Sequence, residues 1–395
     1  MSRSRAHVPT VAIITSVVPS YRAGFYDRLF SRDDLLVDVY CQSDLPGVNV
    51  RTIHDRYLAR VNLVKAISAD NEALSWQRIP WRKILFTYDV VFVDGNPRNL
   101  SHAVAATLLR MLRRNVVLWT MGHSYRANRA TERIRLLWTR MFKHIFLYTD
   151  AEVRAFRADG FARHVLTAMN NGLDQKKIDE VISTWDDGRL AEWRRDHGLD
   201  KRTMLLSCTR LEQKNKFDLM VDALPSIQRQ VPDVTWCIIG DGPERDRLTA
   251  AGKDAGLADH VRFVGELYDE HELAPWFLSA QLLIHPGAIG LTLLHAFGYG
   301  LPVVTHGSAE RHGPEFGAFQ EDLAGRTFRE NDSESLAETI VALLRNAPAR
   351  SSMKRHVQNV ARHDYNVDVM VDRFVYTARI AAGANSAPLA GCDSQ

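Results

Sequence analysis

The sequence predicts an α/β protein with two domains, each built on a parallel β-sheet that helices cover on both faces. Three observations lead to this class. The chain has 395 residues, more than a single hydrophobic core usually serves. Short apolar runs alternate with amphipathic stretches along both halves of the sequence. The apolar runs are continuous, which is typical of parallel strands that are buried on both faces.

In the first half, apolar runs rich in β-branched residues mark five expected strands. These lie at 11–18, 35–41, 90–94, 116–120 and 145–149. The stretch "LSHAVAATLLRMLRR" (100–114) has apolar residues at helical spacing. Basic residues before the first apolar run give the N-terminus some likeness to a signal peptide, but no small-residue cleavage site follows. We therefore expect residues 11–18 to form the first buried strand.

The second half repeats the pattern, with one long helix at its end. Its expected strands lie at 203–209, 234–240, 261–264, 281–285 and 302–305. Residues 171–200 have a relaxed pattern, which we interpret as an interdomain crossing. The helical stretch 352–383 is long enough to return to the first domain, and 384–395 is expected to be a disordered tail.

These segments predict two similar domains that face each other across a cleft. The boundaries follow from the pattern: residues 1–180 form the first domain, 181–365 form the second, and 366–395 hold the return helix and the tail. In open α/β sheets the ligand lies beyond the carboxyl ends of the strands. Loops that follow strands are therefore the places to look for chemistry.

Composition and cysteine content are those of an ordinary protein of the cytoplasm. Hydrophobic residues make up 46% and charged residues 25% of the chain. The four cysteines are far apart in sequence and form no metal or redox pair, which suits a reducing compartment. No apolar run reaches the roughly 18–20 residues of a membrane span.

The charge is divided unevenly between the halves. Residues 1–170 hold 25 Lys and Arg against 14 Asp and Glu, whereas residues 171–395 hold 25 against 33. Within 98–144 there are ten basic residues and one acid, Glu132. This asymmetry favours an anionic partner for the first half, although a solvated basic face is the simpler alternative. No nucleic-acid module is recognised, so we expect no nucleic acid and favour an anionic membrane surface or a phosphorylated acceptor.

Four loops in the second half share the features of a phosphate site. "TRLEQKNKF" places Arg210 at a strand end, with Lys214 and Lys216 after it, and "IIGDGPER" is a strand followed by a glycine-rich turn. "VRFVG" is a short strand that ends at Gly265. In "HPGAIGLTLLHAFGYG" (285–300), unpaired amides of Gly290, Leu291 and Thr292 begin a helix, which is a ready anion site. Together these loops predict a cradle for a diphosphate.

The ordered set of these motifs resembles the nucleotide-sugar half of retaining GT-B glycosyltransferases, the large family four that includes bacterial mannosyl- and glucosyltransferases. "VPSYRAGFYDRLF", "GNPRNLS", "LWTMGHSYR" and "NNGLD" extend the resemblance into the first half, over about residues 10–375. It implies two Rossmann-like domains in the GT-B arrangement, with the C-terminal helix returning to the first domain. It also implies transfer of a sugar from a nucleoside-diphosphate sugar to a hydroxyl of a saccharide or lipid-linked acceptor.

The resemblance also implies roles for individual residues. His123 is expected to contact the transferred sugar, and Arg210 with Lys214 or Lys216 to bind the diphosphate. Acceptor contacts are expected from Tyr21, Arg22, Asn96 and Arg98. The expected donor-binding residues are Gly240, Val264, Gly287, Ile289, Gly290, Leu291, Thr292, His295 and Glu315.

The chain departs from the family pattern at three positions. The family carries two glutamates eight positions apart, and here they fall on Gly287 and His295. A neutral His295 could still accept one ribose hydroxyl, and Glu315 in "GPEF" is a candidate for the missing acid. A similar variant is found among bacterial surface-polysaccharide transferases. The third departure is Asn215, at the position of the family's phosphate-binding lysine, between Lys214 and Lys216.

The implied reaction needs neither a metal nor another cofactor, since basic side chains and a helix N-terminus can stabilise the leaving diphosphate. No Asp-x-Asp triplet is present. Retention of anomeric configuration is implied by the resemblance alone. We expect a cytoplasmic protein, peripheral on the inner face of the membrane.

Three alternatives remain open at this point. His285, His295 and His306 could bind zinc, although their spacing matches no metal signature. The chain could instead be a nucleotide-sugar-binding module without catalysis, because both family glutamates are absent. It could also be a GT-B sugar-nucleotide epimerase. A nicotinamide enzyme is disfavoured, since no G-x-G-x-x-G turn follows the first strand.

Overall fold

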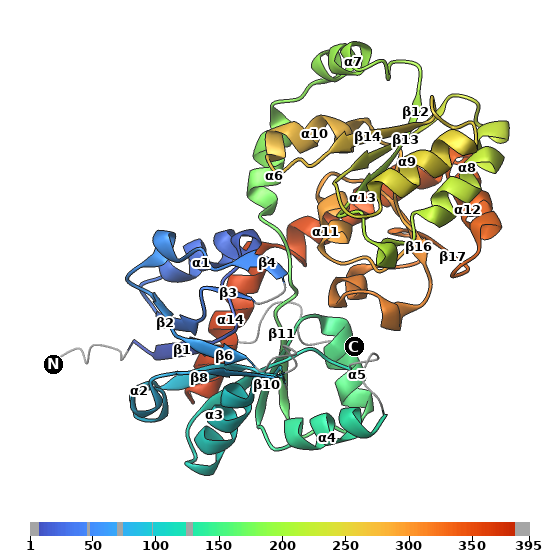
Figure 1. Ribbon diagram of the computed structural model, residues 1–395. Coiled ribbons are helices and arrows are strands. Elements are labelled where there is room, and N and C mark those ends of the chain that lie inside the picture. The colour runs from blue at the N-terminus through green and yellow to red at the C-terminus, as the bar shows by residue number, and fades with distance from the viewer. Residues whose placement is uncertain (1–7, 46–47, 69–73, 97, 124–128, 384–395) are drawn as a thin grey trace. The chain divides into compact units, whose positions relative to one another are not determined.

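The computed structural model describes residues 8–45, 48–68, 74–96, 98–123 and 129–383. It contains two compact units, and Figure 1 shows the elements of each. The first unit takes the described residues up to Asn171 and those from Val367 onward, and the second spans Gly172–Asn366. The sequence boundaries at 180 and 365 thus differ from these by nine residues and one residue. Both sheets are parallel, so the predicted α/β class is confirmed.

A seven-stranded sheet forms the centre of the first unit, in the order β11-β10-β9-β8-β1-β2-β5. Its strands are β1 Thr10–Ile14, β2 Leu36–Cys41, β5 Val61–Leu63, β8 Val90–Asp94, β9 Val116–Trp119, β10 His144–Leu147 and β11 Val165–Ala168. Two short hairpins, β3 Asp44–Leu45 with β4 Val48–Arg51 and β6 Ala66–Ser68 with β7 Ser75–Gln77, lie outside it. The five predicted strands are confirmed. The sequence pattern missed β5 and β11.

Helices cover both faces of this sheet, as continuous apolar strands require. They are α1 Ala23–Phe30, α2 Trp81–Phe86, α3 Leu100–Met111, α4 Arg129–Thr139, α5 Asp150–Ala158 and α14 Val367–Ala381. One apolar cluster joins α1 and α14 to the sheet, and another joins α2, α3 and α5 to its other face. The chain reaches α1 through a short 3-10 turn, η1 Ser20–Arg22.

The return of the C-terminal helix to the first unit is confirmed. Phe374 of α14 stacks on Phe92 of β8 with 4.2 Å between ring centroids, and Arg373 pairs with Asp150 at 2.7 Å. The predicted single helix over 352–383 is wrong, however. It consists of α13 Ala347–His363 in the second unit and α14, separated by residues 364–366. The tail at 384–395 lies outside the described residues, as does Arg126 of the basic run.

The second unit has a six-stranded sheet in the order β14-β13-β12-β15-β16-β17. Its strands are β12 Thr203–Cys208, β13 Val234–Ile239, β14 Val261–Gly265, β15 Leu282–His285, β16 Val303–His306 and β17 Gly325–Phe328. The five strands predicted here are confirmed, and β17 was missed. Strand order reverses at the β12–β15 pair, where parallel sheets usually bind ligands.

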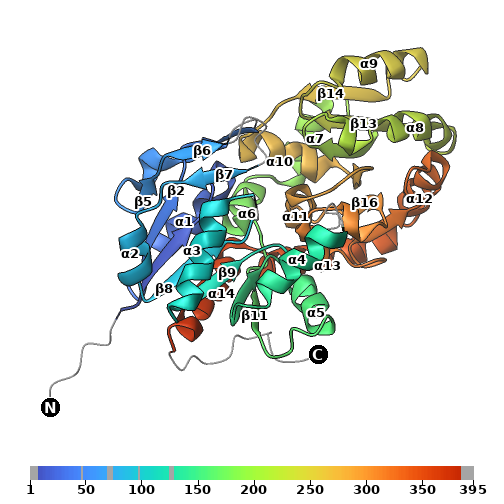
Figure 2. The same ribbon diagram turned by 60° about the horizontal axis from the view of Figure 1, so that its bottom comes forward.

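Eight helices surround this sheet within the described residues, and Figure 2 shows them from a second direction. In addition to α13, they are α6 Gln175–Ser183, α7 Asp187–Asp196, α8 Asp218–Gln230, α9 Arg245–Asp254, α10 Glu270–Ser279, α11 Leu291–Gly298 and α12 Ser333–Arg345. One apolar cluster includes α6, α10, α11 and α13, and the other includes α8 and α12. Short 3-10 turns follow β12 and β16: η3 Gln213–Asn215, η4 Ala309–Arg311 and η5 Pro314–Ala318.

The interpretation of 171–200 as an interdomain crossing is wrong. This stretch forms α6 and α7 of the second unit. Asp174 and Asp186 cap the two helices, accepting hydrogen bonds from the amides of Lys177 and Arg189. The pattern concealed α7 because this helix buries none of its residues.

Candidate functional site

Two sets of side chains lie at carboxyl ends of strands, one in each unit, and they are described separately. The set in the second unit begins with the loop after β12. Arg210 and Lys214 are both exposed and share Glu212, with Nε–Oε1 and Nζ–Oε2 distances of 3.4 and 2.5 Å. Asn215 is buried, and its side-chain Nδ2 donates to the Arg210 carbonyl at 2.7 Å. Asn215 therefore holds the loop in place and leaves any phosphate contact to its neighbours.

Lys216 lies in a different environment from Lys214. Its ammonium donates to Glu330 Oε1 at 2.9 Å and to Asn331 Oδ1 at 2.7 Å. Glu330 also accepts from Ser308 and Arg311. Burial alone would raise the pKa of Glu330, but the hydrogen bonds from Ser308 and Lys216 outweigh it and lower the pKa to about 2. Lys216 is thus fixed in an ion-pair network.

Glycines let these loops approach one another closely. Gly240 has φ 130°, and a Cβ at this position would lie 2.9 Å from the Thr209 carbonyl carbon. A Cβ on Gly287 would lie 2.6 Å from the Cα of Asn215. The space that a side chain at 287 would need is therefore filled by the β12 loop. Val264 is half-buried in β14, and its contacts are with the apolar core.

The start of α11 presents unpaired amides. Gly290 is the N-cap, and Thr292 Oγ1 donates to the Cys208 carbonyl at 3.1 Å, which ties the helix to the end of β12. Within the described part of the chain, the amides of Gly290, Leu291 and Thr292 have no acceptor. The amide of Ile289, by contrast, donates to His312 Nδ1 at 3.1 Å. An anion at this helix mouth would therefore meet three free N–H groups.

Carboxylates lie beside α11 at both ends. Glu315 is buried in η5, and its Oε2 is 3.6 Å from where a Cβ on Gly290 would be. At the other end, His295 Nε2 lies 2.8 Å from Glu270 Oε1, and the hydroxyl of Tyr299 donates to the same oxygen at 2.5 Å. Burial would raise the pKa of Glu270, but the hydrogen bonds from His295 and Tyr299 hold it below its usual value. The Nε2 atom of His295 is thus occupied.

The three histidines of the zinc alternative lie in separate environments. His285 donates from Nδ1 to the Gly287 carbonyl at 3.3 Å, and His306 stacks on His312 with 3.9 Å between ring centroids. Burial lowers the pKa of both His285 and His306 to about 4. Among the residues that the structure describes, no three His, Cys, Asp or Glu side chains are grouped as metal ligands.

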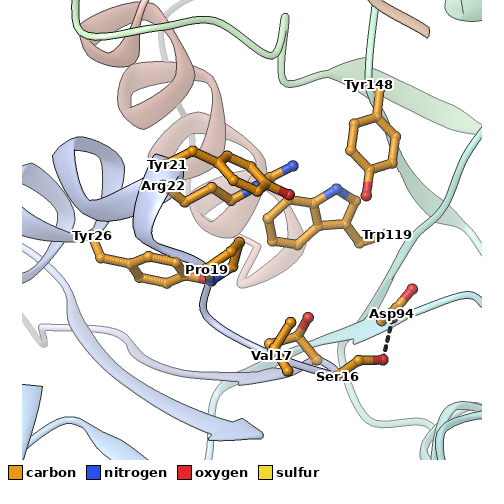
Figure 3. Close-up of a pocket in the computed structure, with 10 residues that line it drawn as sticks. Ser16, Val17, Pro19, Tyr21, Arg22, Tyr26, Asp94, Trp119 and Tyr148 are labelled. Carbon is orange, nitrogen blue, oxygen red and sulfur yellow. Dashed lines mark hydrogen bonds between the residues drawn. The ribbon is translucent and has the colours of Figure 1, made fainter. Parts of the chain in front are cut away.

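In the first unit, a pocket of about 140 Å³ opens at the carboxyl ends of β1, β8, β9 and β10. Figure 3 shows side chains that line it: Ser16, Val17, Pro19, Tyr21, Arg22, Tyr26, Asp94, Trp119 and Tyr148. Drug-sized ligands usually occupy pockets of about 300–1,000 Å³. This pocket therefore has room for a group about as large as one sugar ring.

Arg22 lies among three aromatic rings in this pocket. Its guanidinium carbon is 5.9 Å from the Tyr21 centroid, 5.5 Å from Trp119 and 5.7 Å from Tyr148 (Figure 3). Such contacts hold a guanidinium in place without neutralising it. Aromatic faces and a cation in one pocket offer stacking and hydrogen bonding to a polar ring.

Asp94 forms the opposite wall of the pocket. Its Oδ2 accepts from Ser16 Oγ at 3.4 Å, and its Oδ1 accepts from the amide of Asn96 at 3.1 Å. Burial raises the pKa of Asp94 to about 6, opposed by these two hydrogen bonds. Near neutral pH it is a carboxylate that can accept a hydrogen bond from a ligand hydroxyl.

The structure brings together only part of the predicted set in the first unit. Tyr21 and Arg22 line the pocket, whereas Asn96 and Arg98 form the turn behind Asp94, where the Arg98 amide donates to Asn96 Oδ1 at 3.1 Å. His123 lies after β9 but does not line this pocket. Its Nε2 is 2.5 Å from Asp159 Oδ2 and its Nδ1 is 3.4 Å from Glu132 Oε1.

Sequence reasoning missed Asp94, Trp119 and Tyr148 in the pocket, and Glu270 beside α11. A signal for the first three existed, because each stands within one residue of the end of a predicted strand. Glu270 begins a helix, and its contact with His295 depends on how α10 and α11 pack. The sequence pattern contains no signal for that packing.

Comparison with known proteins finds relatives of the second unit and of the fold. Residues 191–360 match the family model "Glycosyl transferases group 1". The GtfA subunit of the UDP-N-acetylglucosamine–peptide N-acetylglucosaminyltransferase of Streptococcus agalactiae is 25% identical over 185 residues, 44% of this chain and 34% of that protein. The GDP-mannose-dependent α-(1-6)-phosphatidylinositol monomannoside mannosyltransferase of Mycobacterium tuberculosis is 33% identical over 132 residues, 31% of this chain and 34% of the relative. The chain thus aligns with about a third of the length of these curated relatives.

Solved structures match over nearly the whole chain. Anabaena Alr3699/HepE in complex with UDP superposes with a TM-score of 0.67 at 17% identity, covering 93% of this chain and 99% of that one. Sucrose-phosphate synthase of Thermosynechococcus elongatus superposes with a TM-score of 0.63 at 16% identity, covering 95% and 100%. At such low identity these matches show the fold, which is the predicted GT-B fold. The chain therefore has two Rossmann-like units, and the second contains the residues that match the glycosyl transferases group 1 model.

Proposed function

We propose that this protein is a glycosyltransferase that moves a sugar from a nucleoside-diphosphate sugar to a hydroxyl of a saccharide or lipid-linked acceptor in glycoconjugate or surface-polysaccharide synthesis. One observation carries the proposal. Within the residues that match the glycosyl transferases group 1 model, the free amides of Gly290–Thr292 lie on the sheet edge that also carries Arg210 and Lys214. A leaving diphosphate develops negative charge, and these are the groups that would stabilise it.

We assign the phosphate contact to Lys214 rather than Lys216. The ammonium of Lys216 is held by Glu330 and Asn331, whereas Lys214 is exposed and pairs only with Glu212 among the described residues. Arg210 shares Glu212 with Lys214, so an incoming diphosphate would compete with one carboxylate for two cations. Exposed ion pairs of this kind are weak, so the exchange costs little.

The donor's ribose and sugar are proposed to lie along α11. His295 and Glu270 form a paired site, in which Glu270 supplies the carboxylate that would accept ribose hydroxyls and His295 positions it. Glu315 stands beside Gly290 and is proposed to supply the acid near the donor sugar. Gly240, Val264, Gly287 and Ile289 would contribute backbone and shape. Solved neighbours bound to UDP and UDP-glucose support a nucleotide-sugar donor.

The acceptor is proposed to bind in the pocket of the first unit. Trp119 and Tyr148 would stack on the ring, Arg22 and Tyr21 would bind polar groups, and Asp94 would accept a hydrogen bond from a hydroxyl. Asn96 and Arg98 act through the turn that holds Asp94. His123 is proposed to contact the transferred sugar, and this contact would require it to release Asp159.

Three finer features complete the proposal. Transfer proceeds with retention, with the leaving phosphate taking the acceptor proton, and needs no metal. The absence of an Asp-x-Asp triplet from the sequence supports a transfer without a metal. The basic first half attaches the protein to the anionic cytoplasmic face of a membrane. No helix among the described residues is long and apolar enough to cross a bilayer.

The proposal is tested by offering the purified protein UDP- and GDP-sugars with candidate acceptors and measuring release of nucleoside diphosphate. We expect acceptor-dependent release that persists in EDTA and gives an α-linked product from an α-linked donor. Tight nucleotide binding without release would identify a binding module. Isomerisation of the donor without acceptor would identify an epimerase, and either result would overturn the proposal.

A further inference from the structure

A second cavity in the first unit lies at the sheet edge opposite the acceptor pocket. It measures about 390 Å³ and includes Val116 and His144, the first residues of β9 and β10, whereas the acceptor pocket includes Trp119 and Tyr148 at or just after their other ends. The second cavity is lined by four basic side chains, Arg110, Arg113, Arg114 and Lys143, and by residues 380–383, which include the last residues of α14. None of the described residues that line it is acidic. We call this group the basic cavity.

In the part of the chain that the structure describes, no carboxylate balances the positive charge of the basic cavity. Within the described residues, none of its three arginines and Lys143 takes part in an ion pair. Arg110 donates from Nε to the Met141 carbonyl at 2.9 Å, and Arg114 donates from Nη2 to the Tyr88 carbonyl at 3.0 Å. A guanidinium has five N–H groups, so most of these donors remain available to an anion.

Among the described residues, His144 has an unpaired ring nitrogen in the wall of the cavity. It lines the cavity and is only 6% exposed, yet its Nδ1 has no hydrogen-bond partner in the described part of the chain. Buried polar atoms are rarely left unpaired. Burial, together with the charge of Lys143, lowers its pKa to about 4, so the ring is neutral and can donate one N–H. The Nδ1 atom is itself covered from solvent, so the cations of the cavity, and not this nitrogen, would contact an anion.

Exposed apolar side chains stand next to the cavity residues in sequence and on α4, which is hydrogen-bonded to α3. Met111 and Leu112 stand between its arginines in sequence and are 71% and 47% exposed, and Met141 is 45% exposed. On α4, Ile134 and Leu137 are 69% and 64% exposed. Ile134 and Leu137 are three positions apart on α4, so they lie on the same side of this helix, and Met141 follows in the turn after it. A hydrogen bond of 3.1 Å from Trp138 Nε1 to Thr107 Oγ1 joins α4 to α3.

We propose that the basic cavity binds the phosphate of an anionic lipid headgroup, while the apolar residues around it enter the outer acyl layer. Both halves of the surface then have a partner: phosphate for the cations, and lipid for the methionines and leucines. A soluble phosphate would leave the apolar rim exposed, and a single-stranded nucleic acid would need aromatic stacking platforms, which do not line the cavity. The inference rests on the proposed membrane attachment but not on sugar transfer.

Flotation of the full chain with lipid vesicles tests the charged part of the site. We expect binding to vesicles of phosphatidylcholine with phosphatidylglycerol, and none to phosphatidylcholine alone. The double substitution Arg113→Gln with Lys143→Gln removes two exposed charges and should weaken partition about 30-fold, or about fivefold per charge. Lys253→Gln with Arg345→Gln removes the same charge from exposed positions in the second unit and should leave binding unchanged.

A second variant tests the apolar part. Met111→Ser with Leu137→Ser keeps every charge and changes only exposed side chains, so it should fold. It should bind anionic vesicles at low salt and release them at salt concentrations that the unchanged protein tolerates. Both double variants should keep the nucleotide affinity of the parent. A loss of vesicle binding with nucleotide binding intact therefore concerns this site alone.

Three results would overturn the proposal. If the parent and the Arg113–Lys143 variant bound vesicles equally well, the cavity would not be a membrane contact. Binding of glycerol phosphate at the cavity without vesicle binding would assign it to a soluble anion. Self-association that the Met111–Leu137 variant abolishes, without vesicle binding, would assign the face to a second copy of the chain. Absence of sugar transfer would leave the lipid site unaffected.

Discussion

At the scale of single residues, the donor site depends on cations that are held only weakly before the ligand arrives. Arg210 and Lys214 are exposed and share one carboxylate, so they keep their charge for a phosphate. Arg210→Ala should lower kcat/KM for the donor by about 10²–10³, the usual effect of losing one donor to a developing anion. Steady-state kinetics with the donor varied would measure it. Arg229→Ala, an exposed change on α8, is the control and should have no effect.

The two lysines of the same loop should behave differently. Lys214→Met should weaken nucleotide affinity by calorimetry and leave the melting temperature unchanged. Lys216→Met breaks the network with Glu330 and Asn331, so it should lower the melting temperature and change affinity less. The reverse pattern would show that Lys216 is the phosphate ligand.

Asp94 gives the acceptor side a pH dependence. Its pKa is raised to about 6, so the carboxylate is lost when the pH falls through 6. If the carboxylate receives an acceptor hydroxyl, kcat/KM for the acceptor should rise with pH through this value and then level off. The Asp94→Asn variant should have a low kcat/KM for the acceptor at every pH and should show no rise in kcat/KM near pH 6. If kcat/KM of the variant still rose with pH near 6, another titrating group would be responsible for the rise.

At the scale of elements, the loop after β12 and the start of α11 fit only with glycine at 287. Gly287→Ala would drive a Cβ to 2.6 Å from Asn215 Cα, where backbone cannot yield easily. We expect a loss of about 1–3 kcal/mol in the free energy of unfolding, measured with urea. Gly307→Ala meets only ordinary contacts of 3.5 Å or more and is the matched control. Gly287→Glu, which restores the family residue, should also destabilise and not improve catalysis.

The contact between α10 and α11 should depend on pH in a defined direction. The pKa of Glu270 is lower in the fold than its ordinary value of 4.5. Its stabilisation is therefore complete above the ordinary value and is lost as the pH falls through the lowered one. The melting-temperature difference between the parent and Glu270→Gln should be constant near neutral pH and shrink at acid pH. A difference that grew with acid would contradict the assigned pairing with His295.

Elements whose local pattern matches their environment could be predicted from sequence. The apolar runs around Val91 and Ile238 predicted strands to within one residue of their observed bounds, because strands covered on both faces are apolar throughout. The short strand β5 at Val61–Leu63 and the polar helix α7 lack such runs, and both were missed. The break between α13 and α14 is set by the change of unit at 366, a tertiary feature without a strong local signal.

At the scale of the whole molecule, the site could be predicted as far as topology determines it. Parallel strands bring their carboxyl ends to one edge, so Arg210, Gly240 and Gly290 had to share an edge of the second sheet. Which side chain pairs with which could not be predicted. The pairing of His295 with Glu270 and that of Lys216 with Glu330 depend on contacts between distant segments.

The central claim is that the start of α11, with Arg210 and Lys214, binds the diphosphate of the donor. A crystal structure of the protein with UDP or GDP tests it most directly. We predict that phosphate oxygens accept hydrogen bonds from the amides of Gly290–Thr292, with the Arg210 guanidinium and the Lys214 ammonium within hydrogen-bond distance. A nucleotide bound at another place, with these amides free of phosphate, would contradict the account.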